Sequence, residues 1–154
     1  MIRSLEAARV RVADRDTDVR ADSQVGHGPL RPLSERARQT GMTVVVGAPI
    51  SNPNGLPSIG AITFHPDGRG SLYRKHFLHP GEEQYAAPGA AISALIDVRG
   101  VPVALAICAD TTHQAHPHAA VLAGATLYVA GSVITPGGYD KDTTQLASHA
   151  RQFS

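Results

Sequence analysis

An α/β fold is expected from this sequence, with helices covering sheets built of short, strongly apolar strands. Runs rich in Val, Ile, Leu and Ala at residues 42–47, 101–108 and 126–130 have the continuous apolar character of buried strands. Three further segments favour helices, and they lie at residues 30–40, 116–123 and 140–152. Strands interspersed with helices in this way are typical of layered α/β domains, in which the helices lie on the outside.

Composition narrows the class of protein. A chain of 154 residues can form one domain with a real core, and its 42% hydrophobic and 18% charged residues are ordinary for a soluble globular protein. A net charge of +1 gives no field that would attract nucleic acid or an anionic membrane, so neither is an expected partner. The sequence has no apolar run near the roughly 20 residues of a membrane span and no signal-peptide pattern, so we expect a cytoplasmic protein.

The first half of the chain predicts one helix followed by a meander of strands. Residues 1–26 carry little apolar weight, match no packed element and are expected to be weakly ordered. The helix at 30–40 should end at Gly41, a residue suited to a C-terminal cap. Turn-forming residues then separate the expected strands, which lie at 42–47, 58–65 and 71–75. The strand at 42–47 is expected to be covered on both faces.

The second half predicts an ordered loop, a hairpin and a strand between two helices. Residues 76–90 contain two Pro-Gly pairs and should form a loop without regular structure. Strands at 92–98 and 101–108 should pair through the two-residue turn Arg99-Gly100, and 126–130 should be another buried strand. Cys108, the single cysteine, then ends a strand just before an expected helix, where backbone amides can face its sulfur.

Several short motifs follow one another in a recognisable order between residues 42 and 150. The first two are Tyr73-Arg74-Lys75-His76-Phe77-Leu78 and Ile107-Cys108-Ala109-Asp110, whose Lys75 and Cys108 are 33 residues apart. Between them lie Pro80-Gly81-Glu82 and Pro88-Gly89, and two apolar segments flank the set, Val44-Val45-Val46-Gly47-Ala48-Pro49 and Gly124-Ala125-Thr126-Leu127-Tyr128. On these motifs, residues 42–150 resemble a carbon–nitrogen hydrolase of the nitrilase superfamily, with the first as the family's lysine motif and the second as its cysteine motif.

The resemblance implies a nitrilase-like α-β-β-α sandwich, here incomplete at both ends, with residues 27–154 as the central part of the domain. It also implies roles for three residues: Cys108 as nucleophile, Lys75 as the cation beside the oxyanion, and Glu82 as the supporting carboxylate. Glu82 is chosen over Glu83 by its spacing to Gly89. The implied substrate is a small-molecule amide or nitrile, with the amide preferred, cleaved through a Cys acyl-enzyme. No metal or organic cofactor is expected, and we expect a homo-oligomer.

Two departures from the family's pattern affect the expected activity. No segment before the strand at 42–47 matches the phenylalanine-proline-glutamate that carries the family's general base, and Glu6 lacks both the proline and a preceding strand. Gln114 and Ala115 stand where the family commonly has proline and glutamate. We therefore expect impaired turnover. The alternative is a catalytically inactive remnant or interaction subunit of the same fold.

Two other classes of function are weaker alternatives. The histidines at 113, 116 and 118, and those at 76 and 79, have the close spacing that metal sites use, but Pro117 interrupts the first group and no companion carboxylate is evident. A thiol-based redox protein would use Cys108, yet the chain lacks the resolving cysteine that such proteins usually need.

Overall fold

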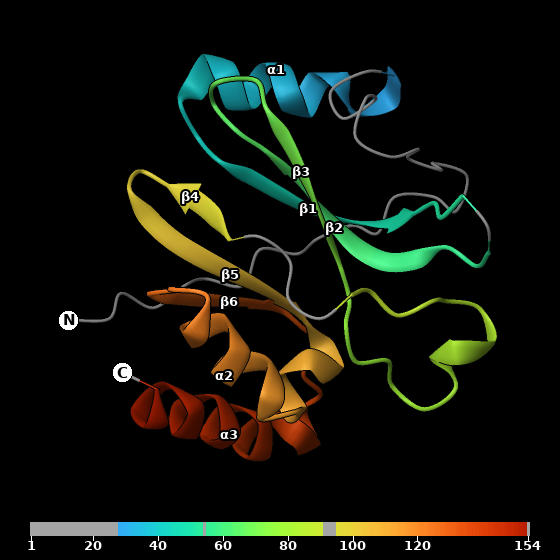
Figure 1. Ribbon diagram of the computed structural model, residues 1–154, viewed down its shortest axis with the longest axis vertical. Helices are drawn as coiled ribbons and strands as arrows, with labels where there is room; N and C mark the ends of the chain where they lie inside the picture. The colour runs from blue at the N-terminus through green and yellow to red at the C-terminus, as the bar shows by residue number, and fades with distance from the viewer. Residues whose placement is uncertain (1–27, 54, 91–94, 154) are drawn as a thin grey trace.

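Two three-stranded sheets lie face to face between helices in the computed structural model, which describes residues 28–53, 55–90 and 95–153. Figure 1 shows the order of layers: helix α1, the sheet β1-β2-β3, the sheet β4-β5-β6, and helices α2 and α3 together. This is the predicted α-β-β-α arrangement. The expectation that residues 1–26 are weakly ordered falls outside the described residues.

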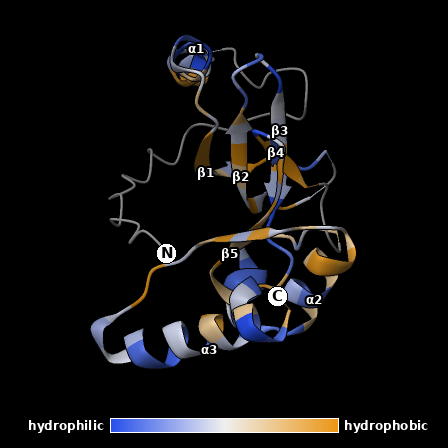
Figure 2. Ribbon diagram, turned by 90° about the vertical axis from the view of Figure 1, so that its left-hand side faces the viewer, coloured by the Kyte–Doolittle hydropathy of each residue, from blue (hydrophilic) through white to orange (hydrophobic). Residues whose placement is uncertain are grey.

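The first sheet is an antiparallel meander covered on one face by a helix. Its elements, all near their predicted positions, are α1 (Arg31–Thr40), β1 (Val44–Ile50), β2 (Ser58–Phe64) and β3 (Gly70–Arg74). Gly41 ends α1 in the left-handed conformation with a φ of 66°, as the C-cap prediction requires. Ala37 of α1 packs on Ile62 and Phe64 of β2, and these three side chains are at most 1% exposed. Figure 2 shows the hydrophobic colouring gathered in the strands.

The second sheet combines an antiparallel hairpin with one parallel strand. Its elements and the helices that follow are β4 (Ile96–Val98), β5 (Val101–Ile107), α2 (Ala115–Leu122), β6 (Leu127–Gly131) and α3 (Tyr139–Gln152). The hairpin prediction is confirmed, because Arg99 and Gly100 turn the chain with φ angles of 55° and 81°. Residues 92–94 of the strand expected at 92–98 are outside the described residues.

Three expectations about local structure are wrong. The strand at 42–47 is expected to be covered on both faces and the strand at 126–130 to be buried, yet Val45 of β1 and Val129 of β6 are each 42% exposed. Exposure alternates along both strands, so the side chains on one face of each are less buried than those on the other. Cys108 is not the last residue of its strand, because β5 stops at Ile107 and Cys108 begins the short 3-10 helix Cys108–Thr112. A third correction is a 3-10 turn at Glu82–Gln84, inside the loop expected to be irregular.

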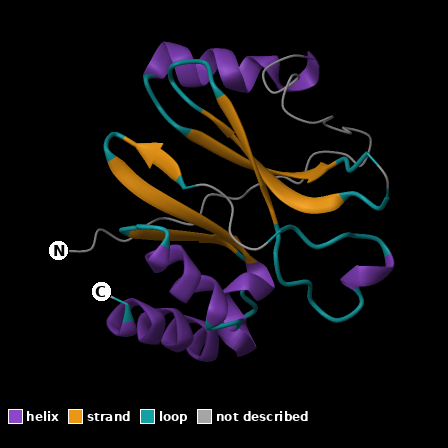
Figure 3. Cartoon of the chain, in the orientation of Figure 1, coloured by secondary structure: helices purple, strands orange, loops and turns teal. Residues whose placement is uncertain are grey.

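The loop after β3 is held back against the strand that it leaves. Figure 3 shows this loop running beyond the sheets and carrying one short helical turn. The amide of Gly89 donates to the carbonyl of Lys75 at 2.7 Å, which closes the loop. A Cβ on Gly89 would lie 2.4 Å from the carbonyl oxygen of Arg74, so the close approach requires glycine. The Pro-Gly motif therefore anchors the loop at the end of β3.

Several large apolar side chains between residues 121 and 139 are exposed. They are Val121, Leu122, Leu127, Val129, Val133 and Tyr139. The expected homo-oligomer would cover such surface, and it stays a prediction. Among the helices of the described residues, none has the length and apolar content needed to cross a membrane.

Candidate active site

Lys75 is a buried cation at the end of β3. Its side chain is 1% exposed, and its Nζ lies 2.5 Å from Glu82 Oε2. Burying an ammonium is costly unless a counter-charge accompanies it, and Glu82 supplies that charge from the turn of the following loop. The structure therefore brings two of the three predicted site residues into direct contact.

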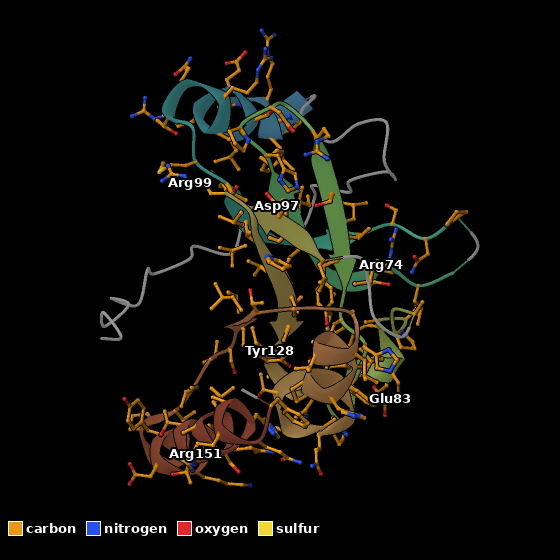
Figure 4. All side chains as sticks on the ribbon, turned by 60° about the vertical axis from the view of Figure 1, so that its left-hand side comes forward. Arg74, Glu83, Asp97, Arg99, Tyr128 and Arg151 are labelled. Carbon is orange, nitrogen blue, oxygen red and sulfur yellow. The ribbon has the colours of Figure 1, made fainter. Side chains whose placement is uncertain are left out.

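Glu82 is also tied to the backbone of its own loop. Its Oε2 accepts a second hydrogen bond from the amide of His79 at 2.8 Å. Burial raises the pKa of Glu82, but the hydrogen bonds from Lys75 and His79 outweigh burial and hold that pKa below its ordinary value. Glu83 is exposed and accepts from the amide of Gly81 instead. Figure 4 labels Glu83 on this loop. Of the two neighbouring glutamates, only Glu82 pairs with Lys75.

Cys108 lies where β5 ends, with a backbone conformation that is rare for a residue with a side chain. Its φ is 47°, in the left-handed region that costs most L-residues roughly 1–2 kcal/mol. The side chain is partly exposed, and its carbonyl accepts from the hydroxyl of Thr111 at 2.8 Å. Strain of this kind commonly occurs at functional sites, including turns that present a nucleophile after a strand.

A single carboxylate joins the Cys108 turn to the segment around Lys75. Asp110 is fully buried, and its Oδ1 accepts from the amides of His76 at 3.1 Å and Phe77 at 2.8 Å. Its Oδ2 accepts from the amide of Ile107 at 2.8 Å and the hydroxyl of Tyr73 at 2.6 Å. Backbone directly after Lys75 and directly before Cys108 therefore rests on the same side chain.

The hydrogen-bond network continues from Asp110 into α2 and β6. His116 is buried on α2, with its Nε2 at 2.9 Å from the hydroxyl of Tyr73 and its Nδ1 at 2.8 Å from the hydroxyl of Tyr128. Figure 4 labels Tyr128, which belongs to β6. Burial and the neighbouring carboxylate of Asp110 raise the pKa of both tyrosines, so both hydroxyls keep their protons.

The direction of the protons follows from these contacts. Because Tyr73 donates to Asp110, its oxygen accepts from a protonated Nε2 of His116. The Nδ1 of a neutral His116 then accepts from Tyr128. Burial lowers the pKa of His116 below 6.5, and the neighbouring His76 and His113 lower it further. The negative charge of Asp110 acts in the opposite direction and raises that pKa. A neutral imidazole on His116 therefore satisfies both of its hydrogen bonds, to Tyr73 and to Tyr128.

The other closely spaced histidines contact aromatic rings or backbone. The ring of His113 stacks on Phe77 with centroids 4.1 Å apart, and the ring of His118 stacks on Phe153 at 5.7 Å. His79 Nδ1 contacts the carbonyl of Pro80. Within the described ranges, no group of three or more His, Cys, Asp or Glu side chains is arranged to hold a metal ion.

His116 should make the folded protein sensitive to acid. Its pKa is depressed in the folded state and near 6.5 in the unfolded chain, so the unfolded chain binds more protons as the pH falls below 6.5. We expect the free energy of unfolding to fall between pH 6.5 and 5, by up to about 1.4 kcal/mol per pH unit for this group. Denaturant titrations at several pH values measure this slope.

Two variants separate His116 from the other histidines. His116→Gln should flatten the slope, whereas His118→Gln should keep it because His118 is exposed. Equal slopes in the wild type and His116→Gln would contradict the neutral, buried state of His116.

Sequence reasoning missed the residues that connect the site. Tyr73 and Asp110 stood inside recognised motifs, and His116 was considered only as a metal ligand. The available signal was an aspartate two residues after the cysteine, at the end of an apolar strand, since a buried carboxylate needs several donors. Nothing in the sequence indicates that those donors come from the segment around residue 75.

Comparisons with known proteins agree with the fold. The sequence pattern of the family described as Carbon-nitrogen hydrolase matches residues 17–154. The amidase from Nesterenkonia sp. AN1 is 22% identical, with a TM-score of 0.67, and the match covers 84% of this chain and 55% of that chain. A carbon-nitrogen hydrolase from Helicobacter pylori G27 is 19% identical, with a TM-score of 0.60, and the match covers 82% of this chain and 47% of that chain. Among curated proteins, none matches the chain.

Two further structures of the Nesterenkonia amidase contain small amides or amide-derived groups. One mutant is in complex with butyramide, and another shows covalent addition of the acetamide moiety of fluoroacetamide at its active-site cysteine. At 21% and 22% identity, these likenesses show the fold alone. This chain spans about half the length of the two solved amidase structures, at 53% of each.

Proposed function

Because the chain belongs to the carbon-nitrogen hydrolase family, we propose that it acts on non-peptide carbon–nitrogen bonds of small amides through an acyl-enzyme on Cys108. The observation that carries this proposal is the buried ion pair of Lys75 and Glu82 beside the backbone that Asp110 ties to the cysteine turn. The amides and acetamide group bound to the solved amidase favour an amide over a nitrile.

Each proposed residue has a chemical role in the reaction. The thiolate of Cys108 forms a bond to the carbonyl carbon, and the carbonyl oxygen becomes an oxyanion. The ammonium of Lys75 stabilises that charge, and Glu82 holds the ammonium in place. The carbon–nitrogen bond then breaks as the nitrogen takes a proton from the solvent and leaves as ammonia or an amine. Water hydrolyses the remaining thioester, which releases a carboxylic acid, restores the thiolate and returns one proton to the solvent.

We further propose that this 154-residue chain by itself is acylated faster than it is deacylated. The residues before β1 contain no match to the segment that holds the family's general base. General acid–base catalysis typically contributes about a hundred- to ten-thousand-fold, so its loss slows the attack of water on the thioester. An activated ester needs little help with its leaving group and should still acylate Cys108.

The test is a burst assay with p-nitrophenyl acetate, followed by intact-mass measurement. We expect one equivalent of nitrophenol to be released rapidly and an acetyl adduct to persist on Cys108. The variant Cys108→Ala should show neither the burst nor the adduct. A wild-type chain that never acquires an adduct would contradict the hydrolase proposal. Sustained turnover of an unactivated amide such as butyramide would contradict the proposed slow deacylation.

A further inference from the structure

The buried carboxylate of Asp110 connects the two sheets at the place where both proposed catalytic segments leave their strands. Its hydrogen-bond donors are Tyr73 of β3, the two amides that follow Lys75, and the amide of Ile107 at the end of β5. The strands β3 and β5 belong to different sheets. The relative position of these two strand ends therefore depends directly on one side chain.

The geometry requires a carboxylate rather than a group of similar size. All four contacts place donors toward Asp110: three backbone N–H groups and the hydroxyl of Tyr73. An ionised carboxylate accepts on both oxygens, whereas an asparagine amide would turn an NH2 group toward two of the donors. Tyr128, His116 and Tyr73 are neutral and hydrogen-bonded in series. This series keeps the hydroxyl of Tyr73 pointed at Asp110.

We propose that Asp110 is a positioning residue that fixes the Lys75 ammonium relative to the Cys108 turn, an inference that rests on the function proposed above. Asp110 acts through the three backbone amides and the Tyr73 hydroxyl that it holds, and it does not touch the substrate. Its contribution would come at the step where the oxyanion forms, since the value of a charge there depends on its placement. A misplacement of about 1 Å can lower a rate by about a hundred-fold.

Two reactions of Cys108 distinguish positioning from a general loss of structure. Acylation by p-nitrophenyl acetate forms an oxyanion and needs Lys75 in place. Alkylation by iodoacetamide forms no oxyanion and needs only an accessible, ionised sulfur. A positioning role predicts that loss of the carboxylate lowers the first rate far more than the second.

The experiment compares the full-length wild type with Asp110→Asn, and with Asp97→Asn as the matched control. Asp97 also accepts a backbone amide, that of Gly100 at 3.1 Å, but it is exposed and lies on the β4-β5 hairpin. For Asp110→Asn we expect the saturating acylation rate to fall about a hundred-fold, alkylation to fall no more than about three-fold, and the half-saturating ester concentration to stay unchanged. Asp97→Asn should leave both rates unchanged.

The outcomes separate this inference from the function on which it rests. A folded Asp110→Asn chain that acylates at the wild-type rate, or that loses acylation and alkylation equally, overturns the positioning role and leaves the hydrolase proposal intact. A wild-type chain that forms no adduct overturns both. If Asp110→Asn does not fold, Tyr73→Phe carries the test, because it removes one donor and leaves three on Asp110. Acylation reduced several-fold with alkylation unchanged then supports the role, and unchanged acylation overturns it.

Discussion

Replacing Lys75 by methionine is expected to lower the rate of Cys108 acylation by about a hundred- to a thousand-fold, the usual effect of removing one oxyanion-stabilising group. Methionine is close to lysine in length and apolar in character, so it suits a side chain that is 1% exposed. Glu82 is 18% exposed and keeps its hydrogen bond from His79, so its carboxylate has a partner without the ammonium. Stopped-flow release of nitrophenol measures the rate.

The chain offers a matched control for this substitution. Its only other lysine, Lys141, is exposed on α3, and Lys141→Met should leave acylation unchanged. Thermal melting shows whether each variant remains folded. Acylation of a folded Lys75→Met chain at the wild-type rate would exclude Lys75 from the reaction.

The ion pair of Lys75 and Glu82 should dominate the stability of this part of the fold. Glu82→Gln removes the counter-charge of an ammonium that is 1% exposed, and removing one partner of such a buried pair typically costs about 3 kcal/mol. Glu82→Gln introduced into the Lys75→Met background leaves no uncompensated charge, and its cost there should be close to zero. Urea titrations of the four proteins give the coupling energy between the two residues.

Glu83→Gln controls for the loss of a glutamate from the same turn. Glu83 is exposed and accepts a hydrogen bond from the amide of Gly81, so its substitution should change the free energy of unfolding by less than about 0.5 kcal/mol. Equal costs for Glu82→Gln in the wild-type and Lys75→Met backgrounds would show that the pair contributes no net stability.

Local chemistry accounts for most of the elements. Gly41 ends α1 because a residue without a Cβ adopts positive φ easily, and Arg99-Gly100 turns the hairpin for a related reason. Burial of the edge strands was the part that local pattern predicted wrongly. A continuous apolar run looks the same whether one face of the strand is covered or both, so Val45 and Val129 gave no sign of their exposure.

The candidate site, like the fold, was predicted from the sequence only in part. Motif spacing was enough to select Lys75, Glu82 and Cys108 and to prefer Glu82 over Glu83. The preference agrees with the ion pair to Lys75, because both residues lie on one continuous stretch of chain that the turn folds back on itself. The catalytic roles of these three residues stay predictions until the reactions of Cys108 are measured.

The order of the elements, the family, and the residue types that carry the proposed chemistry follow from the sequence, since these depend on short stretches of chain. That Asp110 accepts hydrogen bonds from both sheets, and that His116 joins it through Tyr73, follows from the folding of distant segments against one another. In the sequence, Asp110 lies 37 residues after Tyr73, and His116 lies 43 residues after Tyr73. The physical reason is that a buried polar group is stable only when its partners are present, and those partners are brought together by the packing of the two sheets.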